Sequence, residues 1–119
     1  LTASNIALGM KRLVKKALEA EVWRNKPNIL IVAPPPILKE CENSIVGKDM
    51  GICSDKSYLI AKEYSLVAKE LNVKFLDAAP IVEMNKIDFM HLTADSHIKL
   101  AEKVSEIIKN TFGSDEVKE

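Results

Sequence analysis

An aspartate and a histidine three residues apart form the pair in this chain best suited to acid-base chemistry. They lie in the stretch Asp88-Phe89-Met90-His91-Leu92-Thr93. At this spacing a carboxylate can accept a hydrogen bond from the imidazole Nδ1–H, which selects one tautomer and leaves Nε2 free as a general base. The spacing also fits a structural interpretation in which Asp88 caps a turn and His91 packs locally. The surrounding elements must decide between the two.

Three helices and two strands are expected around this pair. Apolar residues at spacings of three and four predict an amphipathic helix over residues 1–23, a second helix that ends at Asn72, and a third that begins after Thr93. Residues 28–33 and 73–77 are short, apolar and rich in β-branched side chains, which favours buried strands. Residues able to begin or end the helices are Thr2 or Ser4, Asp55 or Ser57, Asn72, Thr93 and Gly113.

This order of elements predicts an α/β fold with parallel strands. The carboxyl ends of parallel strands meet at one edge of a sheet, where catalytic groups of α/β proteins gather. The turn Pro34-Pro35-Pro36 and the loop that carries Asp88 and His91 both follow strands, so we expect them to share that edge. Two strands and three helices cover only part of such a sheet. We therefore expect the sheet to be completed by more of the same polypeptide or by another subunit.

Composition narrows the class of protein. The chain has 119 residues, 47% of them hydrophobic, and its 17 Lys and Arg balance 17 Asp and Glu. This balance lacks the basic footprint of a nucleic-acid or anionic-membrane binder, and the apolar run 29–33 is far too short to span a bilayer. Two cysteines favour the cytoplasm over a disulfide framework, although a loop-closing disulfide between Cys41 and Cys53 is an alternative. We interpret Leu1 as a cut end.

Several segments together resemble the SGNH (GDSL-type) hydrolases. Residues 88–93 and the following helix, 96–104, are similar to the last sequence block of that family, in which Asp-x-x-His supplies two members of a Ser-His-Asp triad. Residues 29–36 resemble the family's strand and proline turn, and residues 5–14 resemble the helix after its Asn block. The resemblance covers about residues 3–110 and favours the bacterial arylesterase and acyltransferase branch.

The resemblance implies a three-layer α/β/α sandwich with a parallel sheet, the flavodoxin-like arrangement. Residues 1–113 would form the C-terminal portion of one domain, and residues 114–119 would form a polar tail. It also implies serine esterase or acyl-transfer chemistry on a small-molecule ester, with His91 as general base and acid and Asp88 orienting it. Pro35, Pro36 and Ile37 would contact the substrate.

The same resemblance exposes a difference from the family. No Gly-Asp-Ser and no Gly-x-Asn-Asp occurs in the 119 residues, so the nucleophile and the oxyanion donors cannot be assigned here. The chain alone is therefore expected to be inactive and to require the N-terminal portion of the fold or another subunit. Such esterases use neither a metal nor an organic cofactor, and a homo-oligomer is expected. Five apolar residues could simply cover the edge of the sheet, or they could correspond to the family's acyl-pocket wall and subunit contacts: Ile37, Leu38, Ile45, Val46 and Met50.

Three alternatives stay open. Cys41 or Cys53 could serve as a thiol nucleophile beside His91. His97 could join a metal site, although a surface or packing role is favoured. The chain could also be a non-catalytic α/β interaction module that completes its sheet with another chain.

Overall fold

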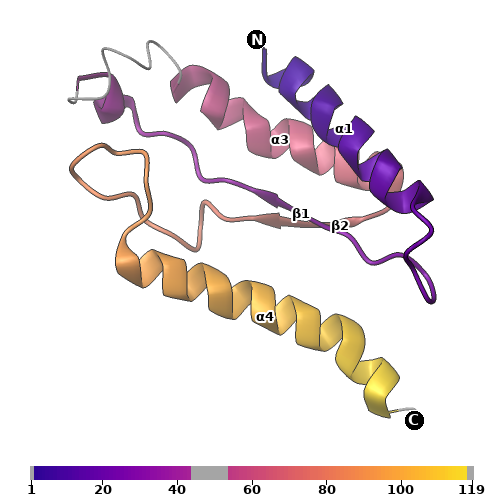
Figure 1. The fold of residues 1–119 in the computed structure, drawn as a ribbon. Helices are drawn as coiled ribbons and strands as arrows, with labels where there is room; N and C mark the ends of the chain where they lie inside the picture. The colour runs from indigo at the N-terminus through magenta and orange to yellow at the C-terminus, as the bar shows by residue number, and fades with distance from the viewer. Residues whose placement is uncertain (1, 44–53, 118–119) are drawn as a thin grey trace.

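A computed structural model describes residues 2–43 and 54–117. Its elements are α1 (Ala3–Glu19), β1 (Leu30–Ala33), the 3-10 helix η1 (Lys39–Asn43), α3 (Ser54–Leu71), β2 (Lys74–Asp77) and α4 (Ala94–Val117). Figure 1 shows α1 and α3 on one face of the sheet and α4 on the other. The expected α/β fold is confirmed as three helices and a two-strand parallel sheet, a partial α/β/α arrangement.

The two strands run parallel with Leu30 beside Lys74 and Ala33 beside Asp77. Among the residues that the structure describes, β1 and β2 pair only with each other. The strand β1 alternates buried and half-buried residues, with Ile31 and Ala33 buried, so its second face is less enclosed than its apolar sequence predicts.

The core lies between the sheet and the two helices above it. Ala7 and Val14 of α1, Ile31 of β1 and Val67 and Ala68 of α3 form its buried centre. The amphipathic pattern of α1 explains this placement, because spacings of three, four and seven put these side chains on one helix face. A salt bridge between Lys11 and Glu70, 2.9 Å long, joins α1 to α3 outside the core.

Helix α1 begins where expected but ends early. Thr2 is its N-cap, with Oγ1 accepting a hydrogen bond from the Asn5 N–H at 3.1 Å. The prediction that the helix continues to Trp23 is wrong, because Ala20 takes an extended conformation with ψ 141°. At the helix end the Ala17 carbonyl accepts two hydrogen bonds, from the Ala20 N–H at 3.3 Å and from the Trp23 indole N–H at 2.8 Å.

Helix α3 ends as predicted and begins slightly earlier than predicted. Asn72 follows it with φ 54°, the left-handed conformation that asparagine tolerates at a helix end. Neither Asp55 nor Ser57 is the residue before the helix, because α3 already starts at Ser54. Ser57 instead accepts a hydrogen bond from the Ile37 N–H at 2.8 Å, which ties α3 to the segment after β1.

Helix α4 begins after Thr93 as predicted but does not end at Gly113. It continues to Val117, so residues 114–117 belong to the helix. A glycine inside a helix costs only about 1 kcal/mol relative to alanine, which a long helix tolerates. Two of its apolar residues are largely exposed, Ile98 at 58% and Ile108 at 50%. No helix among the described residues has the length and hydropathy needed to cross a membrane.

Candidate active site

The Asp88–His91 pair lies on a loop that leaves β2 and returns to α4. Its two sides are joined by an antiparallel bridge between Met84 and Leu92 and by a hydrogen bond of 3.0 Å from the Thr93 N–H to the Glu83 carbonyl. At the base of the loop, the buried Ser96 Oγ accepts the Glu83 N–H at 2.7 Å. These contacts hold the two ends of the loop together, and Asp88 and His91 lie between those ends in the sequence.

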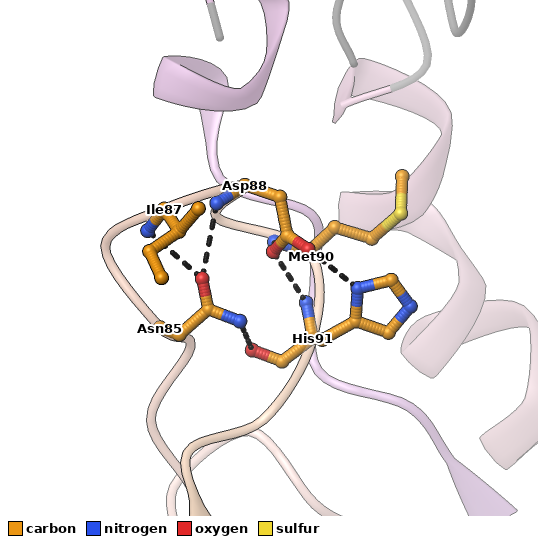
Figure 2. A network of polar contacts seen from close by, with 5 residues as sticks. All are labelled: Asn85, Ile87, Asp88, Met90 and His91. Atoms are coloured by element: carbon orange, nitrogen blue, oxygen red, sulfur yellow. Dashed lines mark hydrogen bonds and ion pairs between the residues drawn. The ribbon is translucent and has the colours of Figure 1, made fainter. Parts of the chain in front are cut away.

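The two side chains make the contact expected from their spacing (Figure 2). Asp88 Oδ2 lies 2.6 Å from His91 Nδ1. The other carboxylate oxygen, Oδ1, accepts the backbone N–H groups of Met90 at 3.0 Å and His91 at 3.1 Å. Because an ionised carboxylate only accepts hydrogen bonds, Nδ1 carries the proton and the neutral ring is in the Nδ1–H tautomer.

These contacts also determine the charge of the carboxylate. The hydrogen bond from the His91 side chain lowers the pKa of Asp88 well below its usual value, and the N–H groups of Met90 and His91 lower it further. Asp88 is therefore ionised at neutral pH.

The imidazole is accessible on its other side. The side chain of His91 is 71% exposed, whereas that of Asp88 is 20% exposed. Within residues 2–43 and 54–117, no group hydrogen-bonds to Nε2. Nε2 of His91 is thus open, while the Asp88 carboxylate is held by three N–H groups of its own loop.

The sequence interpretation missed Asn85, which touches both members of the pair through their backbones (Figure 2). Its Oδ1 accepts the N–H groups of Ile87 at 2.9 Å and Asp88 at 3.0 Å. Its Nδ2 donates to the His91 carbonyl at 3.1 Å, and its backbone N–H donates to the same oxygen at 2.8 Å. An asparagine three residues before the aspartate is the usual signal of a side-chain-capped turn and could have revealed this role.

A strained residue joins this loop to the turn after β1. Phe89 has φ 57°, which is uncommon for a bulky residue, and its carbonyl accepts the Leu38 N–H at 3.0 Å. This bond brings the loop beside the segment that contains Pro35, Pro36 and Ile37, all three of them half-buried. The substrate-contact role predicted for those three residues stays a prediction.

The remaining candidate residues are not brought to the pair in the part of the chain that the structure describes. Cys41 is completely buried in η1. His97 is exposed in the first turns of α4. No group of three or more His, Cys, Asp or Glu side chains among the described residues could hold a metal. Four candidates lie outside the described residues: Ile45, Val46, Met50 and Cys53.

Comparison with known proteins gives a structural result. No protein-family model matches the chain, and no curated protein sequence does. Among solved structures, Est24, a carbohydrate acetylesterase from Sinorhizobium meliloti, matches with a TM-score of 0.80 and 28% identity over 94% of this chain and 54% of its own. The native aryl esterase of M. smegmatis matches with a TM-score of 0.75 and 25% identity over 92% of this chain and 53% of its own.

The chain is a structural match to SGNH-type esterases. The resemblance read from residues 88–104 and 29–36 is thereby confirmed at the level of fold. The chain spans about half the length of the SGNH-type structures that it matches.

Proposed function

We propose that this chain supplies the acid-base half of a serine esterase site. The observation that supports it is the 2.6 Å contact between Asp88 Oδ2 and His91 Nδ1, with the rest of the imidazole exposed. An ionised carboxylate on Nδ1 is the arrangement by which a triad fixes the tautomer of its histidine and stabilises the imidazolium that forms during acyl transfer. The match to carbohydrate acetylesterases and aryl esterases supports ester chemistry for the same loop.

The proposed reaction follows from the free nitrogen of His91. Nε2 takes the proton of a serine hydroxyl as the serine oxygen attacks the carbonyl carbon of an ester. Collapse of the tetrahedral intermediate breaks the bond to the alcohol oxygen, which receives the proton from the imidazolium. Water or another alcohol then attacks the acyl-serine with the same proton transfers. Asp88 stays ionised throughout and balances the positive charge of His91.

The serine is proposed to come from a polypeptide portion that this chain does not span. The chain covers only about half of its solved relatives, and the sequence has no Gly-Asp-Ser block. The partner would be the N-terminal portion of the same fold, from the same gene product or from another subunit in an oligomer. The substrate would be a small ester that lies along the half-buried segment 35–37, which the Phe89–Leu38 bond holds beside the loop.

The test combines a sample inventory with an ester assay. Intact mass and N-terminal sequencing identify every polypeptide in the purified sample, and p-nitrophenyl acetate hydrolysis is measured for the wild type and for His91→Ala. His97→Ala is the matched control, because His97 is the other histidine of the chain and lies exposed outside the loop. We expect activity only in samples that contain a second fragment with a Gly-Asp-Ser block.

In such samples His91→Ala should lower kcat by about a thousandfold or more, and His97→Ala should not change it. Hydrolysis well above background by the 119-residue chain alone would contradict the assignment of the nucleophile. Retained activity in His91→Ala would contradict the role of His91. A two-fragment complex that forms and is inert would favour the non-catalytic interaction module, which the two-strand sheet also permits.

A further inference from the structure

We infer that Asn85 is the positioning residue of the Asp88–His91 pair. The inference rests on the proposed function and goes beyond it, because it assigns a role to a side chain that touches neither substrate nor reacting atom. Asn85 fixes the backbone on both sides of the pair, so that the carboxylate and the imidazole meet in one orientation.

The first half of this role is the anchoring of Asp88. Asn85 Oδ1 accepts two successive N–H groups, those of Ile87 at 2.9 Å and Asp88 at 3.0 Å. These two bonds fix the turn at residues 85–88, and with it the direction in which the Asp88 side chain leaves the backbone. Asp88 Oδ1 repeats this pattern three residues further along the chain, where it accepts the N–H groups of Met90 and His91. Two consecutive side-chain-capped turns thus lead from Asn85 to the imidazole.

The second half is the anchoring of His91. The His91 carbonyl accepts two hydrogen bonds from one residue, 3.1 Å from Asn85 Nδ2 and 2.8 Å from the Asn85 backbone N–H. A carbonyl held by two donors cannot rotate about its peptide plane without losing one of them. The Cα of His91, and with it the starting direction of the exposed ring, is therefore fixed from the side opposite to Asp88.

Of asparagine, aspartate and alanine, only asparagine can make both sets of side-chain hydrogen bonds. Its amide has an acceptor for the two N–H groups and a donor for the carbonyl, whereas aspartate lacks the donor and alanine lacks both. The bond from the backbone N–H of residue 85 to the His91 carbonyl does not depend on the side chain, so Asn85→Ala and Asn85→Asp retain its donor. The Met84–Leu92 bridge and the Thr93–Glu83 bond already close the loop. The Asn85 side chain is therefore needed to orient Asp88 and His91 rather than to close the loop.

The experiment uses NMR on the full 119-residue chain and needs no catalytic activity. The ring-nitrogen shifts of His91 at alkaline pH report the fraction of the Nδ1–H tautomer, and the Nδ1–H proton signal reports the bond to Asp88. The variants are Asn85→Ala, which removes both functions, and Asn85→Asp, which keeps the acceptor alone. Asn28→Ala is the matched control, since Asn28 Nδ2 also donates to a nearby backbone carbonyl, at 3.3 Å, but lies before β1.

We expect Asn85→Ala to lose the Nδ1–H signal and to shift the ring toward a mixture of tautomers. Asn85→Asp should keep the signal with a reduced Nδ1–H fraction, and Asn28→Ala should match the wild type. A merely structural role would lower the melting temperature of the Asn85 variants without moving the tautomer. A wild-type tautomer in folded Asn85→Ala, or an equal loss in Asn28→Ala, would overturn the inference.

If Asn85→Ala does not fold, Asn85→Asp decides, because a wild-type tautomer in that variant would overturn the role of the donor. These outcomes are separate from those of the ester assay. Loss of tautomer control in Asn85→Ala would support the inference even if no serine partner is found. A wild-type tautomer beside full esterase activity would remove the inference and leave the proposed function intact.

Discussion

Replacing the buried Ser96 with alanine tests whether the loop that carries the Asp88–His91 pair depends on its base. Ser96 is 2% exposed, and its Oγ accepts hydrogen bonds from the Glu83 N–H at 2.7 Å and from Thr93 Oγ1 at 2.9 Å. Ser96→Ala leaves the Glu83 N–H without its acceptor in a partly buried place.

The size of the effect follows from these bonds. An unsatisfied buried donor costs about 1–3 kcal/mol. Alanine is a better helix former than serine by roughly 0.5 kcal/mol, and Ser96 lies in the first turn of α4, so this gain offsets part of the loss. The net loss in the free energy of unfolding should be about 1–2 kcal/mol. For a domain of this size we expect the melting temperature to fall by roughly 4–8 °C.

Urea unfolding followed by circular dichroism measures the loss, and amide hydrogen exchange at Glu83 locates it. Ser65→Ala is the control, since the Ser65 hydroxyl donates to the Lys62 carbonyl at 2.7 Å within α3. That bond competes with the helix ladder, so its removal should change stability by less than about 0.5 kcal/mol. Equal effects of the two substitutions, or unchanged exchange at Glu83 in Ser96→Ala, would refute the reasoning.

Two further predictions concern the carboxylate and the core. The pKa of Asp88 is lowered in the folded chain, so its ionised form stabilises the fold above the usual carboxyl pKa, and this contribution is lost as pH falls through the folded-state value. The stability difference between wild type and Asp88→Asn should therefore be largest near neutral pH and shrink in acid; thermal melts across pH measure it, and a constant difference would contradict it. Ile31 is 3% exposed, so Ile31→Ala should cost about 3 kcal/mol and Ile31→Val about 1 kcal/mol in urea unfolding, whereas Leu13→Ala, at a side chain 62% exposed, should cost much less. Equal losses at Ile31 and Leu13 would show that the core is elsewhere.

Local sequence patterns predicted much of the fold. The Thr2 and Thr93 caps, the Asn72 stop and the parallel pairing of two short apolar strands are all confirmed. Each depends on a single residue type or on periodicity within one element, which is information that a sequence carries directly. The contact between Asp88 and His91 is also local, because a spacing of three residues allows the two side chains to meet.

The features that could not be predicted depend on competition between alternatives. Helix α1 ends at Glu19, where Ala20 becomes extended and the Trp23 indole N–H donates to the Ala17 carbonyl, and no spacing rule anticipates this arrangement. Helix α4 passes Gly113 because the cost of one glycine is small against a helix of 24 residues. The left-handed Phe89 gave no signal, since bulky residues rarely adopt that conformation.

The hydrogen bonds that join Asn85, Asp88 and His91 have a kinetic consequence. None of them spans more than six residues. Closing so short a segment costs little entropy, and loops of about ten residues close within roughly 10–100 ns, far faster than a parallel sheet assembles. These hydrogen-bonded turns can therefore form early in folding, before β1 and β2 pair. The long-range bond from the Leu38 N–H to the Phe89 carbonyl is added later, when the loop meets the segment after β1.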